Sequence, residues 1–269
     1  MVDYTFKDRY GFEDLVEIMA ILRSPGGCPW DAEQTHESIK KDFIEETYEA
    51  IEGINKKDKE LLCEELGDVL LQVVFHAQIS RESGEFDISD VTDGICKKLI
   101  ERHPHVFAST KVDSTDEVLA NWDTIKRKSK GQKTQGSSML KIPRELPALM
   151  RAQKIQSKAK KAGFDWETID GAYDALESEI KELKNAAENE NPERIKDELG
   201  DVLFSVVNVA RFLDVDAEEA LTGSSDKFMD RYLKVEKMAA EREINMKESS
   251  IEELDKLWIE AKNSESNKD

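Results

Sequence analysis

The residues of this chain best suited to chemistry are two groups of carboxylates that repeat along the sequence. The first group comprises Glu45, Glu46, Glu49, Glu65 and Asp68. Adding 133 to the last four of these numbers gives identical residue types in a second group, which comprises Glu179, Glu182, Glu198 and Asp201. A pattern that recurs within one chain indicates a duplicated structural unit. We therefore interpret the acids as two copies of one site.

Carboxylates gathered in one place repel one another. Two unit charges about 4 Å apart in a partly screened site cost on the order of 4 kcal/mol. Such a group needs protons or metal cations, and oxygen ligands alone select hard ions such as Mg²⁺, with Mn²⁺ as a substitute. A di-iron bundle would need Glu-x-x-His pairs, yet the four histidines all lie in the first half, at 36, 76, 103 and 105. We interpret His36 as a surface or capping residue.

Magnesium on carboxylates ordinarily serves phosphates, which complete its coordination shell. Basic pairs at i, i+4 spacing are candidates to hold a phosphate chain: Lys98 with Arg102, and Lys227 with Arg231. Two tryptophans, each with a lysine one helical turn later, are candidates to stack on a base: Trp122 with Lys126, and Trp258 with Lys262. Core packing of the tryptophans and ordinary helix C-terminal charge are the alternatives. Together these parts indicate a site for a nucleoside polyphosphate.

The acids lie on helices that we predict to be amphipathic hairpins. In the first hairpin the apolar stripes that we expect to pack are Phe43, Thr47, Ile51 and Ile54, followed by Leu62, Leu66, Val69, Leu70, Val73 and Ala77. The second hairpin spans roughly 172–188 and 193–213. Glycine inside a helix costs about 1 kcal/mol relative to alanine. We therefore expect a close approach of the two helices at Gly67.

Composition limits the class of protein. Of 269 residues, 36% are charged and 7% aromatic, with only 6 prolines, which suits helices joined by short loops. The net charge of −19 argues against a nucleic-acid-binding surface. No run of 18 apolar residues exists, so no membrane span is expected. The N-terminus lacks a signal-peptide layout, and Cys28, Cys63 and Cys96 are interpreted as free thiols. We therefore expect a cytoplasmic protein.

Residues 127–138 are polar and basic and contain no apolar side chain, which is typical of a linker. We therefore predict an all-α protein with two helical domains, at residues 1–127 and 140–269. Residues 128–139 form the predicted linker between them.

The motifs resemble those of a known family, the MazG-like all-α nucleoside triphosphate pyrophosphohydrolases. EExxE, 15 intervening residues and ExxD form its pattern, and GCPWDAEQTHESI, GDVLLQVVFHAQ, RHPHVFA and LPALMRAQKIQ strengthen the similarity over nearly the whole chain. The resemblance implies a tandem repeat of two MazG-like helical bundles, completed by homodimerisation. It also implies Mg²⁺-dependent hydrolysis of NTPs and dNTPs to monophosphate and pyrophosphate, with broad base tolerance, as nucleotide-pool house-cleaning.

The resemblance also implies roles for particular residues. It makes the acids of both groups catalytic metal ligands, and it assigns nucleotide contacts to Lys227, Arg231 and Trp258, with Arg194 beside the phosphate-contacting segment. Ser178 stands where the second motif should have its first Glu. The division of activity between the two sites is therefore open, although family precedent favours the C-terminal one. The alternatives are a narrow-specificity enzyme of the dUTP pyrophosphatase or phosphoribosyl-ATP pyrophosphohydrolase type, and a non-catalytic nucleotide-binding regulatory protein.

Overall fold

The computed structural model describes residues 4–108, 135–189 and 191–266, together with isolated positions between 114 and 125. All the regular secondary structure in these parts of the chain is helical, which confirms the all-α prediction. The chain divides into two compact units, Met1–Lys126 and Arg127–Asp269, which are described separately below. No helix in the described parts is long and apolar enough to cross a membrane.

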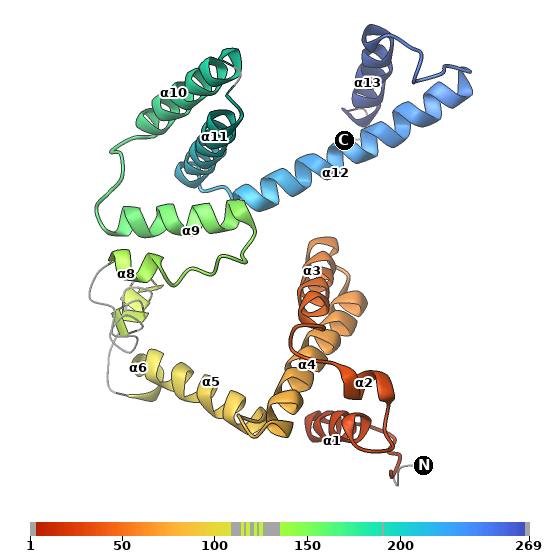
Figure 1. Cartoon of the computed structure of the whole chain (residues 1–269), viewed down its shortest axis with the longest axis vertical. Helices are drawn as coiled ribbons and strands as arrows, with labels where there is room; N and C mark the ends of the chain where they lie inside the picture. Colours follow the sequence, from red (N-terminus) through yellow and green to blue (C-terminus); the bar gives the residue numbers. More distant parts are fainter. Residues whose placement is uncertain are drawn as a thin grey trace. The chain divides into compact units, whose positions relative to one another are not determined.

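The first unit is built on a helical hairpin (Figure 1). Its helices are α1 (Phe12–Arg23), α2 (Pro29–Glu33), α3 (Lys40–Lys56), α4 (Lys59–Glu82), α5 (Ile88–Arg102) and α6 (Pro104–Phe107). Helices α3 and α4 lie side by side, and α1 packs against α4. A small core made of Met19, Ile39, Val74 and Phe75 joins α1, α4 and the segment before α3.

A two-residue turn sets the geometry of the α3–α4 hairpin. Lys57 takes the left-handed conformation at φ 56°, which ends α3. Asp58 then caps α4, because its carboxylate accepts hydrogen bonds from the backbone amides of Glu60 and Leu61 at 3.0 and 3.1 Å. The chain therefore reverses at once, and the acids of α3 come to lie beside those of α4.

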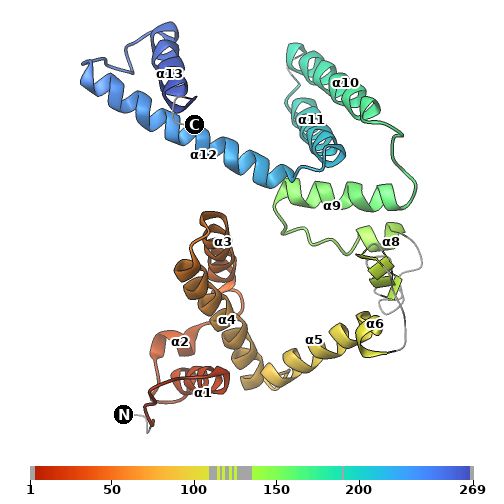
Figure 2. The same cartoon turned by 180° about the vertical axis from the view of Figure 1, so that it is seen from behind.

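The second unit repeats the hairpin and adds a second helix pair (Figure 2). Its helices are α8 (Gln135–Met139), α9 (Ala148–Lys161), α10 (Ile169–Glu188), α11 (Pro192–Phe212), α12 (Ala217–Glu241) and α13 (Ile251–Ser266). Helices α10 and α11 form the hairpin, with α9 packed against α11. Helix α13 folds back on α12 around Val235, Ala239, Leu257 and Ala261. Of the predicted linker, 128–134 lie outside the described residues and 135–139 form α8.

The expected packing of the large apolar residues is wrong for much of the first hairpin. Phe43, Ile51 and Ile54 on α3 and Leu66 and Leu70 on α4 are exposed in the chain. The side of α3 that is covered carries Ala50 and Gly53 instead. Small residues allow the two helices to approach closely, so the bulky side chains lie on the outer faces of the hairpin.

The glycine that permits this approach is Gly53 and not Gly67, which corrects the sequence-based expectation. A methyl group on Gly53 would lie 2.9 Å from the amide nitrogen and 3.0 Å from the Cα of Leu62. A methyl group on Gly67 would meet nothing within 4 Å among the described residues. The close contact therefore lies near the turn, where α3 ends and α4 begins.

Replacing each glycine with alanine tests this assignment. Gly53→Ala should lower the free energy of unfolding by about 1–3 kcal/mol, because backbone atoms of α4 must move. Gly67→Ala, the matched control, should raise it by about 0.5–1 kcal/mol, because alanine loses less conformational entropy in a helix. Urea denaturation of both variants measures the difference. Equal effects of the two substitutions would contradict the close approach at Gly53.

Candidate functional site

Three carboxylates meet across the first hairpin. Glu46 and Glu49 extend from α3 and Glu65 from α4, and one oxygen of each lies within 4.8 Å of the others. We call these three residues the first cluster. Their exposure differs: Glu65 is only 8% exposed, Glu46 is half-buried, and Glu49 is open to solvent.

The neighbouring acids add charge to the first cluster without joining its compact centre. Burial raises the pKa of Glu46, and the charges of Asp68, Glu49 and Glu45 raise it further. The pKa of Glu65 is also raised, first by burial and then by the charge of Glu49 and a hydrogen bond with it. Burial and the neighbouring negative charges therefore both disfavour the ionised forms of Glu46 and Glu65.

The second hairpin places three equivalent carboxylates together. Glu179 and Glu182 on α10 and Glu198 on α11 also lie within 4.8 Å of one another, and we call them the second cluster. Burial raises the pKa of Glu179, followed by the charges of Glu182, Asp201 and Glu198. Asp201 therefore lies near the second cluster as Asp68 lies near the first.

Two residues distinguish the second cluster from the first. The Nε atom of Arg194 donates to Glu198 Oε1 at 3.2 Å, one turn away on α11. The equivalent position in the first unit, 133 residues earlier, is Leu61. The hydroxyl of Ser178 lies 3.5 Å from Glu182 Oε1, where the first unit has Glu45. The second cluster therefore has one acid fewer beside it and a cation already paired to it.

Both clusters suit a hard divalent cation. Their donors are carboxylate oxygens alone, which is the ligand set that Mg²⁺ and Mn²⁺ prefer. Each cluster has one buried carboxylate with more exposed ones around it, so an ion would reach it from solvent. Burial is the main cause of the raised pKa values of Glu46, Glu65 and Glu179, and a divalent ion would relieve the additional contribution from repulsion between the carboxylates.

Each predicted tryptophan contacts an arginine of a predicted basic pair. The Arg102 guanidinium lies 5.0 Å from the ring centre of Trp122, and that of Arg231 lies 5.8 Å from Trp258. Both distances are typical of cation–π contacts. Trp258 also packs against the core between α12 and α13, so part of its surface serves packing. Lys98, Lys227 and Lys262 are exposed, and Lys126 lies outside the described residues.

Among the described residues, Arg102, Arg231 and Trp258 lie on other helices than the acids of their own unit. Arg231 and Trp258 belong to α12 and α13, whereas the second cluster belongs to α10 and α11, and Figure 1 shows the two helix pairs diverging from the α11–α12 junction. In the first unit α5 likewise leads Arg102 away from α3 (Figure 1). Arg231 and Trp258 diverge from the second cluster because α12 is long and straight, and Arg102 diverges from the first cluster because the chain bends sharply between α4 and α5.

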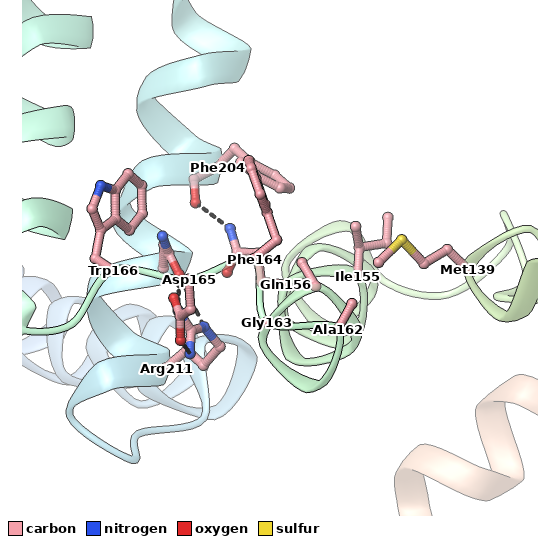
Figure 3. A pocket seen from close by; sticks show the side chains of 12 residues that line it. Met139, Ile155, Gln156, Ala162, Gly163, Phe164, Asp165, Trp166, Phe204 and Arg211 are labelled. Carbon is pink, nitrogen blue, oxygen red and sulfur yellow. Dashed lines mark hydrogen bonds and ion pairs between the residues drawn. The ribbon is translucent and has the colours of Figure 1, made fainter. Parts of the chain in front are cut away.

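The second unit has a cavity of about 580 Å³ between α9 and α11 (Figure 3). The residues around it show that the two repeats pack differently at this point. Phe164, Trp166 and Phe204 line it, and the Asp165–Arg211 ion pair closes one side at 2.6 Å. Asn208 also lines it, at the position where the first unit has the buried Phe75. The segment between α9 and α10, residues 162–168, is shorter than residues 24–39, which supply Ile39 to the first core.

Comparison with known proteins places the repeats in a family. The MazG nucleotide pyrophosphohydrolase domain model matches residues 34–107 and 168–236, which contain the two hairpins. A Thermotoga maritima protein named nucleoside triphosphate pyrophosphohydrolase/pyrophosphatase MazG is 48% identical over 251 residues, 93% of this chain and 95% of the relative.

Two further relatives match more than nine tenths of this chain. An Escherichia coli K12 nucleoside triphosphate pyrophosphohydrolase is 43% identical over 254 residues, 93% of this chain and 97% of the relative. An uncharacterized Bacillus subtilis protein is 46% identical over 256 residues, covering 94% of this chain and 52% of the relative. With two matched repeats and these identities, the chain belongs to the MazG nucleotide pyrophosphohydrolase family.

Proposed function

We propose that this protein hydrolyses nucleoside triphosphates to nucleoside monophosphate and pyrophosphate, with Mg²⁺ as the cofactor and Mn²⁺ as a substitute. The repeated three-carboxylate cluster is the observation that carries the proposal. The activity printed in the names of the Thermotoga and Escherichia relatives supports it. The cytoplasm is the proposed location, supported by three cysteines that are all free thiols.

The proposed roles of the carboxylates, metal binding and proton acceptance, follow their exposure to solvent. Glu46 and Glu65, or Glu179 and Glu198, would hold the metal together with Asp68 or Asp201. Bound Mg²⁺ supplies charge neutralisation for the phosphates and polarises a water. Glu49 and Glu182 are exposed, so each is placed to accept the proton of the attacking water. The water oxygen bonds to the α-phosphorus, the bond to the bridging oxygen breaks, and pyrophosphate leaves with the electron pair.

A homodimer is the proposed assembly. The outer faces of the hairpins carry large exposed apolar residues, including Ile54, Leu66, Leu199 and Leu203, which a partner would remove from water. Lys98, Arg102, Lys227, Arg231 and Trp258 lie on helices that diverge from the acids of their own unit. A second copy can supply these residues to the clusters, where they would neutralise and position the triphosphate.

Broad base tolerance is proposed over narrow specificity, because the acids and arginines recognise the phosphates and not the base. A non-catalytic nucleotide-binding regulator is the other candidate. It is less well supported, because a binding protein gains nothing from two clusters of mutually repelling carboxylates. Turnover assays across eight ribo- and deoxyribonucleoside triphosphates distinguish these candidates.

Neutralising the exposed carboxylate of each cluster tests the proposed chemistry. The double variant Glu49→Gln/Glu182→Gln should lose Mg²⁺-dependent turnover by about 100-fold or more, because both proton acceptors are gone. The single variants report which cluster carries more activity, and Glu85→Gln, an exposed loop acid, is the control. Ion chromatography of the products gives the cleavage position. Orthophosphate and nucleoside diphosphate in place of pyrophosphate would contradict attack at the α-phosphorus.

Exchanging Arg194 and Leu61 tests how a built-in cation affects metal binding. Arg194→Leu, in a Glu46→Gln/Asp68→Asn background that disables the first cluster, should tighten Mn²⁺ binding at the second cluster about two- to fivefold, because the ion no longer competes with the guanidinium for Glu198. Leu61→Arg, in a Glu179→Gln/Asp201→Asn background that disables the second cluster, should weaken binding at the first cluster by a similar factor. Titration calorimetry with Mn²⁺ measures both. Weaker binding by Arg194→Leu would show that the arginine does not compete with the ion.

A further inference from the structure

Two histidines far apart in the sequence meet in the first unit. His36 lies in the turn before α3 and His76 on α4, and their Nδ1 atoms are 2.7 Å apart. Their rings are nearly parallel, at 7° and 5.0 Å between centres. One Nδ1 must donate and the other accept, so the pair shares a single proton. His36 therefore has a side-chain partner on α4, which the interpretation as a surface or capping residue did not include.

Both histidines line a hollow of about 410 Å³ on the surface of this unit. Phe43, Val73, Phe86 and Val91 provide most of the rest of its wall, which is largely apolar. The second nitrogen of His36 is engaged with the buried Ser80 hydroxyl at 3.2 Å. The Nε2 atom of His76 makes no hydrogen bond to any described residue of the chain. The ring centres of His76 and Phe43 are 5.7 Å apart.

The charge of the hollow suits a flat, uncharged ring. Burial lowers the pKa of His76, and the neighbouring His36 lowers it further, so His76 is neutral at pH 7. A neutral imidazole offers an aromatic face, and its free nitrogen can donate or accept according to the tautomer. Aromatic faces stack on any nucleobase, because every base has a π-face.

The hollow lies along the hairpin from the first cluster. Phe43 precedes Glu46 by three residues on the same side of α3. His76 follows Asp68 by eight residues, which is about 12 Å along α4. A ligand that has a polyanionic chain at the acids and a planar heterocycle in the hollow matches this layout. A nucleoside triphosphate has these two parts.

The second unit does not repeat this arrangement. Leu176 and Val209 stand at the positions equivalent to Phe43 and His76, and no histidine follows His105 in the sequence. The segment that contains His36 is longer than its counterpart between α9 and α10. The two repeats therefore share their acids but differ where the base would lie.

We propose that the hollow lined by His36, Phe43 and His76 is the base-binding subsite of the first cluster, in which the nucleobase stacks against the His76 and Phe43 rings. The inference rests on the proposed function, since the triphosphate must be held by the acids. It gives the first cluster a pair of rings for the base that has no counterpart at the equivalent positions of the second unit, Leu176 and Val209.

The test compares a nucleotide with a base-free polyanion. The full-length chain carries Glu179→Gln and Asp201→Asn, two substitutions that remove metal-holding carboxylates of the second cluster, so that binding reports the first cluster. Calorimetry with Mg²⁺ measures the affinity for the α,β-imido analogues of ATP and UTP, which resist cleavage, and for inorganic tripolyphosphate. His76→Val, which installs the residue of the second unit, should weaken binding of both nucleotides about tenfold and leave tripolyphosphate binding unchanged.

Two further variants separate stacking from folding. His76→Phe keeps a flat ring but breaks the bond to His36, so it should retain most of the nucleotide affinity. His103→Ala, a histidine outside the hollow, should change nothing. An equal loss of nucleotide and tripolyphosphate in His76→Val, or no loss of either, would overturn the subsite. Absence of any tripolyphosphate binding before substitution would instead overturn the proposed function of the first cluster.

Discussion

Repulsion between carboxylates held at close range is the constraint on which the structure depends. Each hairpin brings three of them within 4.8 Å, and one of the three is buried. Burial raises the pKa values of Glu46, Glu65 and Glu179, and the neighbouring carboxylates raise them further, so both effects disfavour the charged forms. A fold that served stability alone would gain from an apolar residue at each position. The clusters therefore need a function that uses their charge, and a divalent cation is the simplest partner for it.

The two repeats differ in the charged residues that surround their clustered carboxylates. The second places a guanidinium within the cluster through Arg194 and replaces one glutamate with Ser178. The first keeps all five acids and has no cation at the equivalent Leu61. The repeats also differ around their cores, where the buried Phe75 of the first unit is replaced by Asn208, which lines a cavity in the second. Duplication has thus preserved the acids while the surroundings of each cluster have diverged.

The sequence predicts the clusters better than the packing around them. Glu46, Glu49 and Glu65 could be grouped because their spacing places two of them on one helical face and because the pattern recurs. The apolar stripe at Phe43, Ile51 and Ile54 could not be placed, because periodicity identifies an apolar face but does not say which face packs within the chain. Gly53 was not recognised because its contact with Leu62 depends on the turn between the helices. Contacts between residues distant in sequence, such as His36 with His76, produce no local sequence pattern from which they could be predicted.

Metal uptake by the full-length chain tests the central claim most directly. After removal of divalent ions with a chelator, Mn²⁺ is titrated by calorimetry into the protein and into variants in which one cluster at a time has been neutralised. We predict uptake at both clusters, with each component lost when its own cluster is neutralised. Absence of Mn²⁺ and Mg²⁺ uptake, with or without a nucleoside triphosphate present, would contradict the assignment of these carboxylates as metal ligands.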